Sequence, residues 1–327
     1  MTQWMFSGML VCAAQAGAQP VANAQWNADM AAGRFAQVER AATAKINANP
    51  DDIDAHAALT RSALALNDGL KRDAALKLMD ACVARVPRSA VCHYGVGSLL
   101  GAQAISKDVV KAAMGMSKIR EASQTSPELD TSMFAARSAS AQFYLLAPGL
   151  AGGKVSKAGA SAQTAAALHP YHADILMAIY LLHEGQLDDA ELQLNALKSG
   201  VDVELNEEVG QQRARLAFER LKKKSPANAQ GTFEGFIAER HQLARSHYGL
   251  GHIYSETGAW DQAVAPFTAV SSLQCVADLT NDYRLGMTQQ AKGSRELRRA
   301  AVVRFVAVGK GKPKHLEDAQ KRAVELR

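Results

Sequence analysis

The sequence predicts an all-α protein, built as a right-handed superhelical solenoid of antiparallel helix hairpins. The chain is rich in alanine, and 48% of its residues are hydrophobic while only 6% are aromatic. This composition favours helices over β-sandwiches and barrels. A pattern of small and apolar residues also recurs about every 34 residues along the chain, which is typical of stacked structural repeats. A length of 327 residues suits one elongated array of this kind.

The chain begins with a segment that resembles a secretory signal. Residues 1–24 carry no charge, and the stretch from Trp4 to Ala18 is largely apolar before it gives way to alanine-rich triplets. That stretch is shorter than the roughly 20 residues that span a bilayer, so we expect cleavage rather than anchoring. No Lys or Arg precedes it, so either Met1 lies within a longer signal or the segment is a disordered, alanine-rich leader. The expected mature protein is periplasmic or secreted and has no transmembrane helix.

Stripes of small and apolar residues at helical spacing predict the second helix of successive hairpins. In chain order the stripes and their flanking Gly or Pro residues are Gly33, Phe35, Val38, Ala42 and Pro50; Ala75, Met79, Cys82 and Pro87; Ala158, Ala162, Ala165 and Pro170; Gly185, Leu187, Ala190, Leu194 and Leu197; and Ala229, Phe233 and Phe236.

The clearest unit runs from residue 247 to residue 270. Leu250, Gly251 and Tyr254 share one face of a first helix, which Gly258 is expected to end in the left-handed conformation. A second helix then places Ala263, Phe267 and Val270 on its inner stripe. Leu285, Gly286 and Gly293 repeat the first half of this unit 35 residues later.

These spacings resemble those of tetratricopeptide repeats (TPRs), of an exported bacterial type with degenerate units. The resemblance implies a TPR-like array over residues 25–310, followed by a basic helix or cap over residues 311–327. The final unit, from Arg295 onward, lacks the Ala and Phe of the pattern, so the sequence leaves that hairpin open. Residues 141–154 are also similar to a loop found in exported bacterial repeat proteins.

Two cysteines flank a predicted turn. Cys82 and Cys92 lie almost symmetrically about Val86-Pro87-Arg88, so two antiparallel helices would bring them within disulfide reach. An exported compartment would permit that bond. Two buried thiols, packed as small apolar residues, are the alternative.

No motif predicts catalysis, a cofactor or a metal. The segment from Gly149 to Lys154 has the wrong spacing for a phosphate-binding loop. His169 and His172 are separated by Pro170 and fit no known ligand set. The prediction is therefore a protein that is not an enzyme and holds no cofactor, although a site assembled between repeats is a third hypothesis.

A stack of hairpins can bind a partner in the groove lined by its first helices. The main hypothesis is therefore a scaffold or adaptor of the cell envelope that binds a protein or peptide. Projecting the repeat register places these residues on the concave face: Tyr94, His172, Ile179, Phe218, Arg245, Tyr248, His252, Glu256 and Tyr283.

The alternative hypothesis is attachment to an anionic surface, such as phospholipid or nucleic acid. From Arg284 to Arg327 the chain has 12 Lys and Arg against four Asp and Glu, whereas its overall net charge is only +5. The candidate contacts are Arg295, Arg298, Arg299, Arg304, Lys310, Lys312 and Lys314. The absence of interleaved aromatic residues argues against nucleic acid as the partner.

Overall fold

The computed structural model describes residues 21–106, 109–197, 203–223, 225–238, 243–271, 273, 280–309 and 313–326. Over these residues the protein is helical and has no β-strand, so the predicted all-α class is confirmed. Most of the predicted signal segment lies outside the described residues. Within the described part of the chain, every helix is too short or too polar to cross a bilayer.

The chain divides into two compact units, residues 1–209 and 210–327, with the boundary inside α12 (Val203–Lys222). The helices before α12 are α2 (Ala24–Ala31), α3 (Phe35–Ala48), α4 (Ile53–Leu66), α5 (Gly69–Arg85), α6 (Ala90–Ser106), α7 (Val109–Leu129), α8 (Phe134–Leu146), the 3-10 helix η1 (Gly149–Ala151), α9 (Val155–Ala165), α10 (Pro170–Glu184) and α11 (Leu187–Ala196). Those after it are α13 (Pro226–Ala238), α14 (Leu243–Glu256), α15 (Trp260–Val270), α16 (Asn281–Ala291), α17 (Arg295–Val308) and α18 (Pro313–Glu325).

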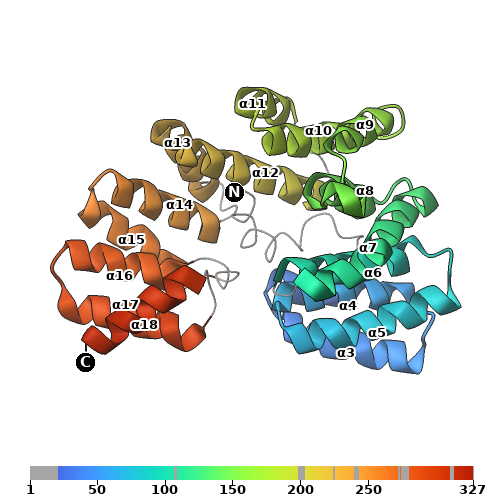
Figure 1. Ribbon diagram of the computed structural model, residues 1–327, viewed down its shortest axis with the longest axis horizontal. Coiled ribbons are helices and arrows are strands. Elements are labelled where there is room, and N and C mark those ends of the chain that lie inside the picture. The colour runs from blue at the N-terminus through green and yellow to red at the C-terminus, as the bar shows by residue number, and fades with distance from the viewer. Residues whose placement is uncertain are drawn as a thin grey trace. The chain divides into compact units, whose positions relative to one another are not determined.

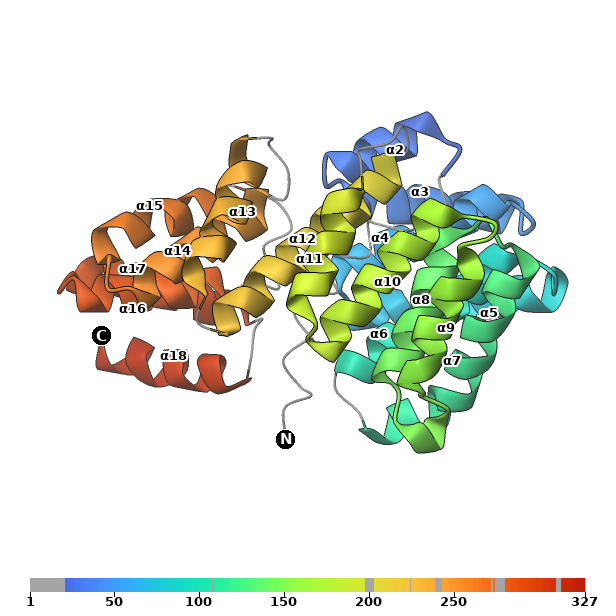
Figure 2. The same cartoon turned by 90° about the horizontal axis from the view of Figure 1, so that it is seen from above.

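The first unit is a stack of helix hairpins (Figure 1). The even-numbered helices are the first helices of the hairpins, and α4, α6, α8 and α10 contact one another in that order. Each odd-numbered helix from α3 to α9 packs against the even-numbered helix that follows it. Figure 2 shows α8, α9 and α10 running next to one another in this arrangement. The same order continues in the second unit, where α14 contacts α16 and α17 contacts α18.

The predicted second-helix stripes form the core of this stack. Their residues are all less than one tenth exposed: Phe35, Val38 and Ala42 in α3; Ala75, Met79 and Cys82 in α5; Ala158, Ala162 and Ala165 in α9; Ala190 and Leu194 in α11; Ala229, Phe233 and Phe236 in α13; and Ala263, Phe267 and Val270 in α15. These predictions are confirmed. In α5, α11, α13 and α15 an alanine at one end of the stripe lets the paired helices approach closely, and the larger residues fill the space beyond, whereas the α9 stripe consists of alanines alone.

The turns within the hairpins follow the glycine pattern in most units. Gly258, between α14 and α15, has a φ of 78°, and Gly293, between α16 and α17, has a φ of 76°. The turn between α4 and α5 uses Asn67 instead, with a φ of 48°. Asn tolerates this left-handed region better than most residues, so the hairpin forms without the glycine signature.

The last hairpin, which the sequence left open, consists of α16 and α17. Arg298 stands where the preceding hairpin has Ala263, and Val302 stands where it has Phe267. Val302 is fully buried, and a Cβ built onto Gly286 would lie 2.9 Å from its Cγ2. The two helices therefore remain close because Val302 packs at the position of Phe267, with Ala301 and Phe305 buried beside it.

Cys82 and Cys92 form a disulfide between α5 and α6, with their Cα atoms 5.7 Å apart. Both cysteines are buried. The bond joins the second helix of one hairpin to the first helix of the next. Closing a loop of this length stabilises a fold by about 3 kcal/mol.

Candidate partner-binding surface

The second unit carries a row of aromatic rings on its first helices. Phe218 lies on α12, and Tyr248 and His252 lie on α14; the ring centroids of Phe218 and Tyr248 are 6.3 Å apart, and those of Tyr248 and His252 are 6.2 Å apart. All three side chains are partly exposed. Glu256 follows one turn later, with its Oε1 3.3 Å from His252 Nδ1. We call these four residues the α12–α14 row.

The inner side of this row rests on the core. The Phe218 ring lies 4.9 Å from that of Phe233, and the Tyr248 ring lies 6.0 Å from that of Phe267. Phe233 and Phe267 are fully buried, so they hold both outer rings in place. The Tyr248 hydroxyl is also hydrogen-bonded to the Thr280 hydroxyl at 3.0 Å. Rings fixed in this way lose little side-chain entropy when they bind a partner.

The chemistry of the row is mixed. Phe218 and Tyr248 offer apolar ring surface, while His252 and the half-exposed Glu256 offer polar groups at its edge. A peptide or helix laid across such a row would bury apolar side chains on the rings and satisfy polar groups at the rim. Nothing in this arrangement resembles a nucleophile with a base. Among the described residues, no group of three or more His, Cys, Asp or Glu could hold a metal ion.

Tyr283, predicted to line the same groove, is instead covered by α18. Its ring stacks on that of His315 with centroids 4.4 Å apart and the planes at 10°, and its hydroxyl donates to Asp318 Oδ2 at 2.9 Å. Burial, reinforced by Asp318, raises the pKa of Tyr283. The sequence held one signal of this contact, because Asp318 follows Tyr283 by 35 residues and so occupies the equivalent repeat position.

Two other predicted groove residues are buried, and their placement on the open surface is wrong. Ile179 on α10 is 1% exposed and Arg245 on α14 is 6% exposed. Each first helix packs against its own partner helix and against the neighbouring hairpins, so its exposed strip is narrower than one helical face. A register projected from a single repeat could not distinguish that strip from its buried margins.

Tyr94 and His172 belong to the first unit and lie partly buried at helix contacts. Tyr94 on α6 packs against Ala90, Met133, Ala135 and Ala136. His172 on α10 stacks on His169 at a centroid distance of 4.9 Å and meets the Phe134 ring edge-on at 5.1 Å.

The basic residues proposed for an anionic surface differ in exposure and in ion pairing. Arg304 pairs with Asp282 at 2.9 Å, and Arg298 is half-buried, while Arg295, Arg299 and Lys314 are exposed. Lys310 and Lys312 lie outside the described residues.

Comparison with known proteins identifies the fold. No family model matches the chain, and no curated protein matches it. A solved tetratricopeptide repeat protein from Parabacteroides merdae ATCC 43184 is similar to it, with 15% identity and a TM-score of 0.51 over 81% of this chain and 96% of that one. The protein has the tetratricopeptide-repeat fold.

Two further structures share similarity with this TPR-fold chain. Human IFIT1, solved as a dimer with PPP-AAAA, is 13% identical with a TM-score of 0.54, and the match covers 91% of this chain and 69% of that one. The match to the anaphase-promoting complex hetero-tetramer Cut9–Hcn1 has 18% identity and a TM-score of 0.49, over 88% of this chain. Our chain spans 52% of the length of that last protein. At these identities the likeness shows the fold alone.

Proposed function

We propose that this protein is a non-catalytic scaffold of the cell envelope that binds a segment of a partner protein on the α12–α14 row. The observation that carries the proposal is the row itself: partly exposed aromatic rings, fixed from below by Phe233 and Phe267, with His252 and Glu256 at the edge. TPR folds support this use because their stacked first helices offer an extended surface to a peptide or helix. The uncharged leader favours an exported protein.

The proposal is tested with two substitutions at the edge of the row. Glu256→Lys and His252→Ser change the chemistry of the surface without removing a core side chain. Glu234→Lys on α13 is the matched control, because Glu234 is exposed on a second helix of the same unit. Unchanged circular dichroism and melting temperature establish that each variant is folded.

Each tagged variant is used for affinity purification from its native envelope, and co-eluting proteins are quantified by mass spectrometry. We expect Glu256→Lys and His252→Ser to reduce the partner's recovery about tenfold or more, the effect of losing one good interface contact. Glu234→Lys should retain it. Equal recovery with all three variants would refute the assignment of the row.

A further inference from the structure

The connection between α8 and α9 displays apolar side chains to solvent. Leu150, in the 3-10 helix of this connection, is fully exposed at 105%, and Leu146, the last residue of α8, is 46% exposed. Single exposed leucines are common on protein surfaces and need no explanation. The backbone around Leu150, however, is unusually constrained.

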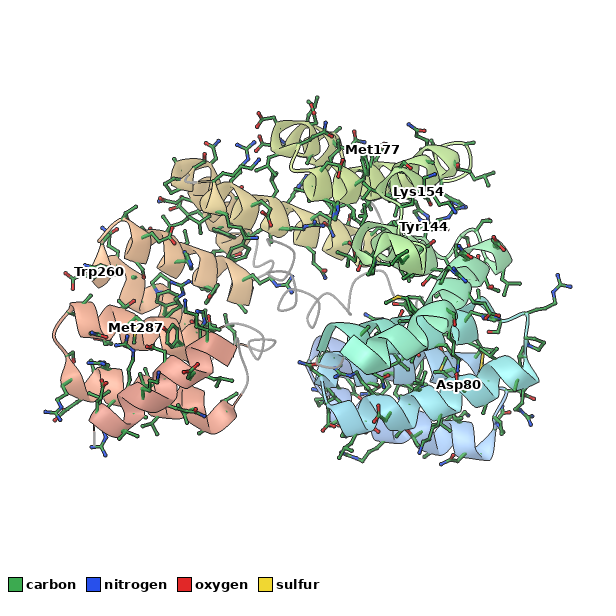
Figure 3. All side chains as sticks on the ribbon, viewed as in Figure 1. Asp80, Tyr144, Lys154, Met177, Trp260 and Met287 are labelled. Carbon is green, nitrogen blue, oxygen red and sulfur yellow. A yellow bond between two sulfur atoms is a disulfide. The ribbon has the colours of Figure 1, made fainter. Side chains whose placement is uncertain are left out.

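Four main-chain hydrogen bonds fix this loop. The amides of Ala151 and Gly153 donate to the Pro148 carbonyl at 2.9 and 3.1 Å, and the Gly152 amide donates to the Gly149 carbonyl at 3.0 Å. The Lys154 amide donates to the Tyr144 carbonyl at 3.0 Å, which ties the end of the loop to the last turn of α8. Figure 3 labels Tyr144 and Lys154, which lie close together.

Two glycines make the conformation possible. Gly152 has a φ of 101°, which other residues rarely adopt, and a Cβ on Gly153 would collide with the Ala147 carbonyl oxygen. The loop therefore holds Leu150 outward in one defined position. Residues on a rigid loop of this kind are often used for binding.

Three exposed cations surround the loop. Lys154 closes it, and Lys157 lies with its Nζ 5.3 Å from the centre of the Tyr144 ring. The Arg120 side chain on α7 runs alongside Gly152, since a Cβ there would lie 2.9 Å from Arg120 Cδ. A protruding apolar tip is thus bordered by positive charge.

We propose that this loop docks the first unit on an anionic phospholipid surface, with Leu150 inserted among the acyl chains and Arg120, Lys154 and Lys157 at the headgroups. Leu150, Lys154 and Lys157 are residue types that favour lipid over a protein partner. Protein hot spots are enriched in Trp, Tyr and Arg, whereas Leu is under-represented among them and Lys is depleted at interfaces. Inserted leucines and peripheral lysines are the groups that bind proteins to anionic membranes.

The test is co-sedimentation of the full chain with vesicles. Vesicles of phosphatidylcholine alone are compared with vesicles that also contain phosphatidylglycerol. We expect binding to the anionic vesicles that weakens as salt screens the charges. Leu150→Ser should lower that binding about tenfold, which corresponds to the loss of one inserted leucine.

Leu70→Ser is the matched control, because Leu70 on α5 is 83% exposed but lies away from this loop in sequence. It should bind like the unmodified chain. Lys154→Gln together with Lys157→Gln should remove most of the preference for phosphatidylglycerol.

The proposal is overturned if the unmodified chain does not bind anionic vesicles at low salt, which is also the outcome expected if the loop contacts an acidic protein. It is equally overturned if Leu70→Ser weakens binding as much as Leu150→Ser. The Glu256→Lys variant should sediment with vesicles normally, so failure of the scaffold proposal and failure of this one are distinguishable.

Discussion

Gly251 shows how a single hydrogen atom in place of a side chain sets the spacing of two helices. A Cβ at this position would lie 2.7 Å from Phe267 Cδ1, closer than side-chain carbons pack. Gly251 therefore allows α14 to rest directly on the Phe267 ring. Gly286 and Val302 make the same kind of contact one hairpin later.

Gly251→Ala should lower the free energy of unfolding by about 1–3 kcal/mol, because the added methyl group overpacks the seam. Chemical denaturation followed by circular dichroism measures the change. Gly231→Ala on α13 is the control, since a Cβ there would meet nothing within 4 Å. Replacing a helical glycine at such an open site should leave stability unchanged or raise it by about 0.5–1 kcal/mol. Similar losses in both variants would mean that the Phe267 contact is not tight.

At this scale the sequence predicts buried residues better than exposed ones. Ala263 and Phe267 could be placed in the core because spacing along a helix determines which residues share a face. Ile179 and Arg245 could not be placed correctly, because burial at the edge of that face depends on neighbouring hairpins. Asn67 shows a third limit: its turn has the left-handed geometry but not the glycine that would reveal it.

At the scale of elements, α18 completes the second unit. Leu316, Ala319 and Ala323 of α18 pack with Val302, Phe305 and Tyr283. Asp318 joins the two sides, since it accepts hydrogen bonds from the Tyr283 hydroxyl and from Arg322. The hydrogen bond from Arg322 has the largest effect and lowers the pKa of the Asp318 carboxyl, and the bond from Tyr283 lowers it further. Burial acts in the opposite direction but is outweighed.

This pKa shift predicts a pH dependence. A carboxyl whose pKa is lower in the folded state contributes stability above its unfolded pKa, and that contribution disappears as the pH falls through the folded value. Asp318→Asn should therefore destabilise the protein by about 1 kcal/mol at neutral pH, the usual worth of such hydrogen bonds. The difference should begin to shrink as the pH falls below 3.8, the ordinary value for an aspartate, and vanish only once the pH lies below the lowered pKa of the folded state.

Thermal melting as a function of pH, for the unmodified chain and Asp318→Asn, measures this effect. Glu317→Gln is the control, because Glu317 pairs with Lys321 at 3.2 Å while both side chains are about 70% exposed. Exposed pairs of this kind contribute little. A constant difference between the native chain and Asp318→Asn at all pH values would contradict the role of the carboxylate.

The sequence predicted a helix or cap after residue 310, but not the side chain that it covers. The contact between Tyr283 and Asp318 follows from the repeat register only if α18 is taken as the first helix of a further unit. A basic tail suggested a solvent-facing segment instead, and only the packing of Leu316 and Ala319 shows otherwise.

At the scale of the whole molecule, repeats that contact mainly their neighbours should also unfold locally. Ala263 is fully buried at the seam between α14 and α15, so Ala263→Arg should cost about 3 kcal/mol or more. Native-state hydrogen exchange should accelerate in α14, α15 and α16, while the amides of α4 to α9 keep their protection.

Ala265→Arg is the control for this experiment, because Ala265 lies on the same helix but is exposed. It should leave exchange unchanged throughout. Loss of protection in α4 to α9 along with α14 to α16 would show that the two units unfold as one.

The overall fold could be predicted from the sequence because each hairpin repeats the same spacing of small and apolar residues. The candidate partner surface could not be predicted in full, since it depends on which side chains remain exposed after all hairpins have packed. Phe218, Tyr248 and His252 were predicted on the concave face and are partly exposed, but Thr280, which holds the Tyr248 hydroxyl, left no signal in the sequence pattern.

The disulfide between Cys82 and Cys92 links α5 to α6 covalently, in addition to the turn that joins them along the chain. A protease that cuts the peptide chain between Val86 and Ser89 would leave both fragments attached, so a nicked molecule would gain only the mass of one water and keep its stacked hairpins until a reductant separated the fragments. In an oxidising environment, this inter-hairpin turn is therefore protected against the effects of cleavage even though it lies outside the helices.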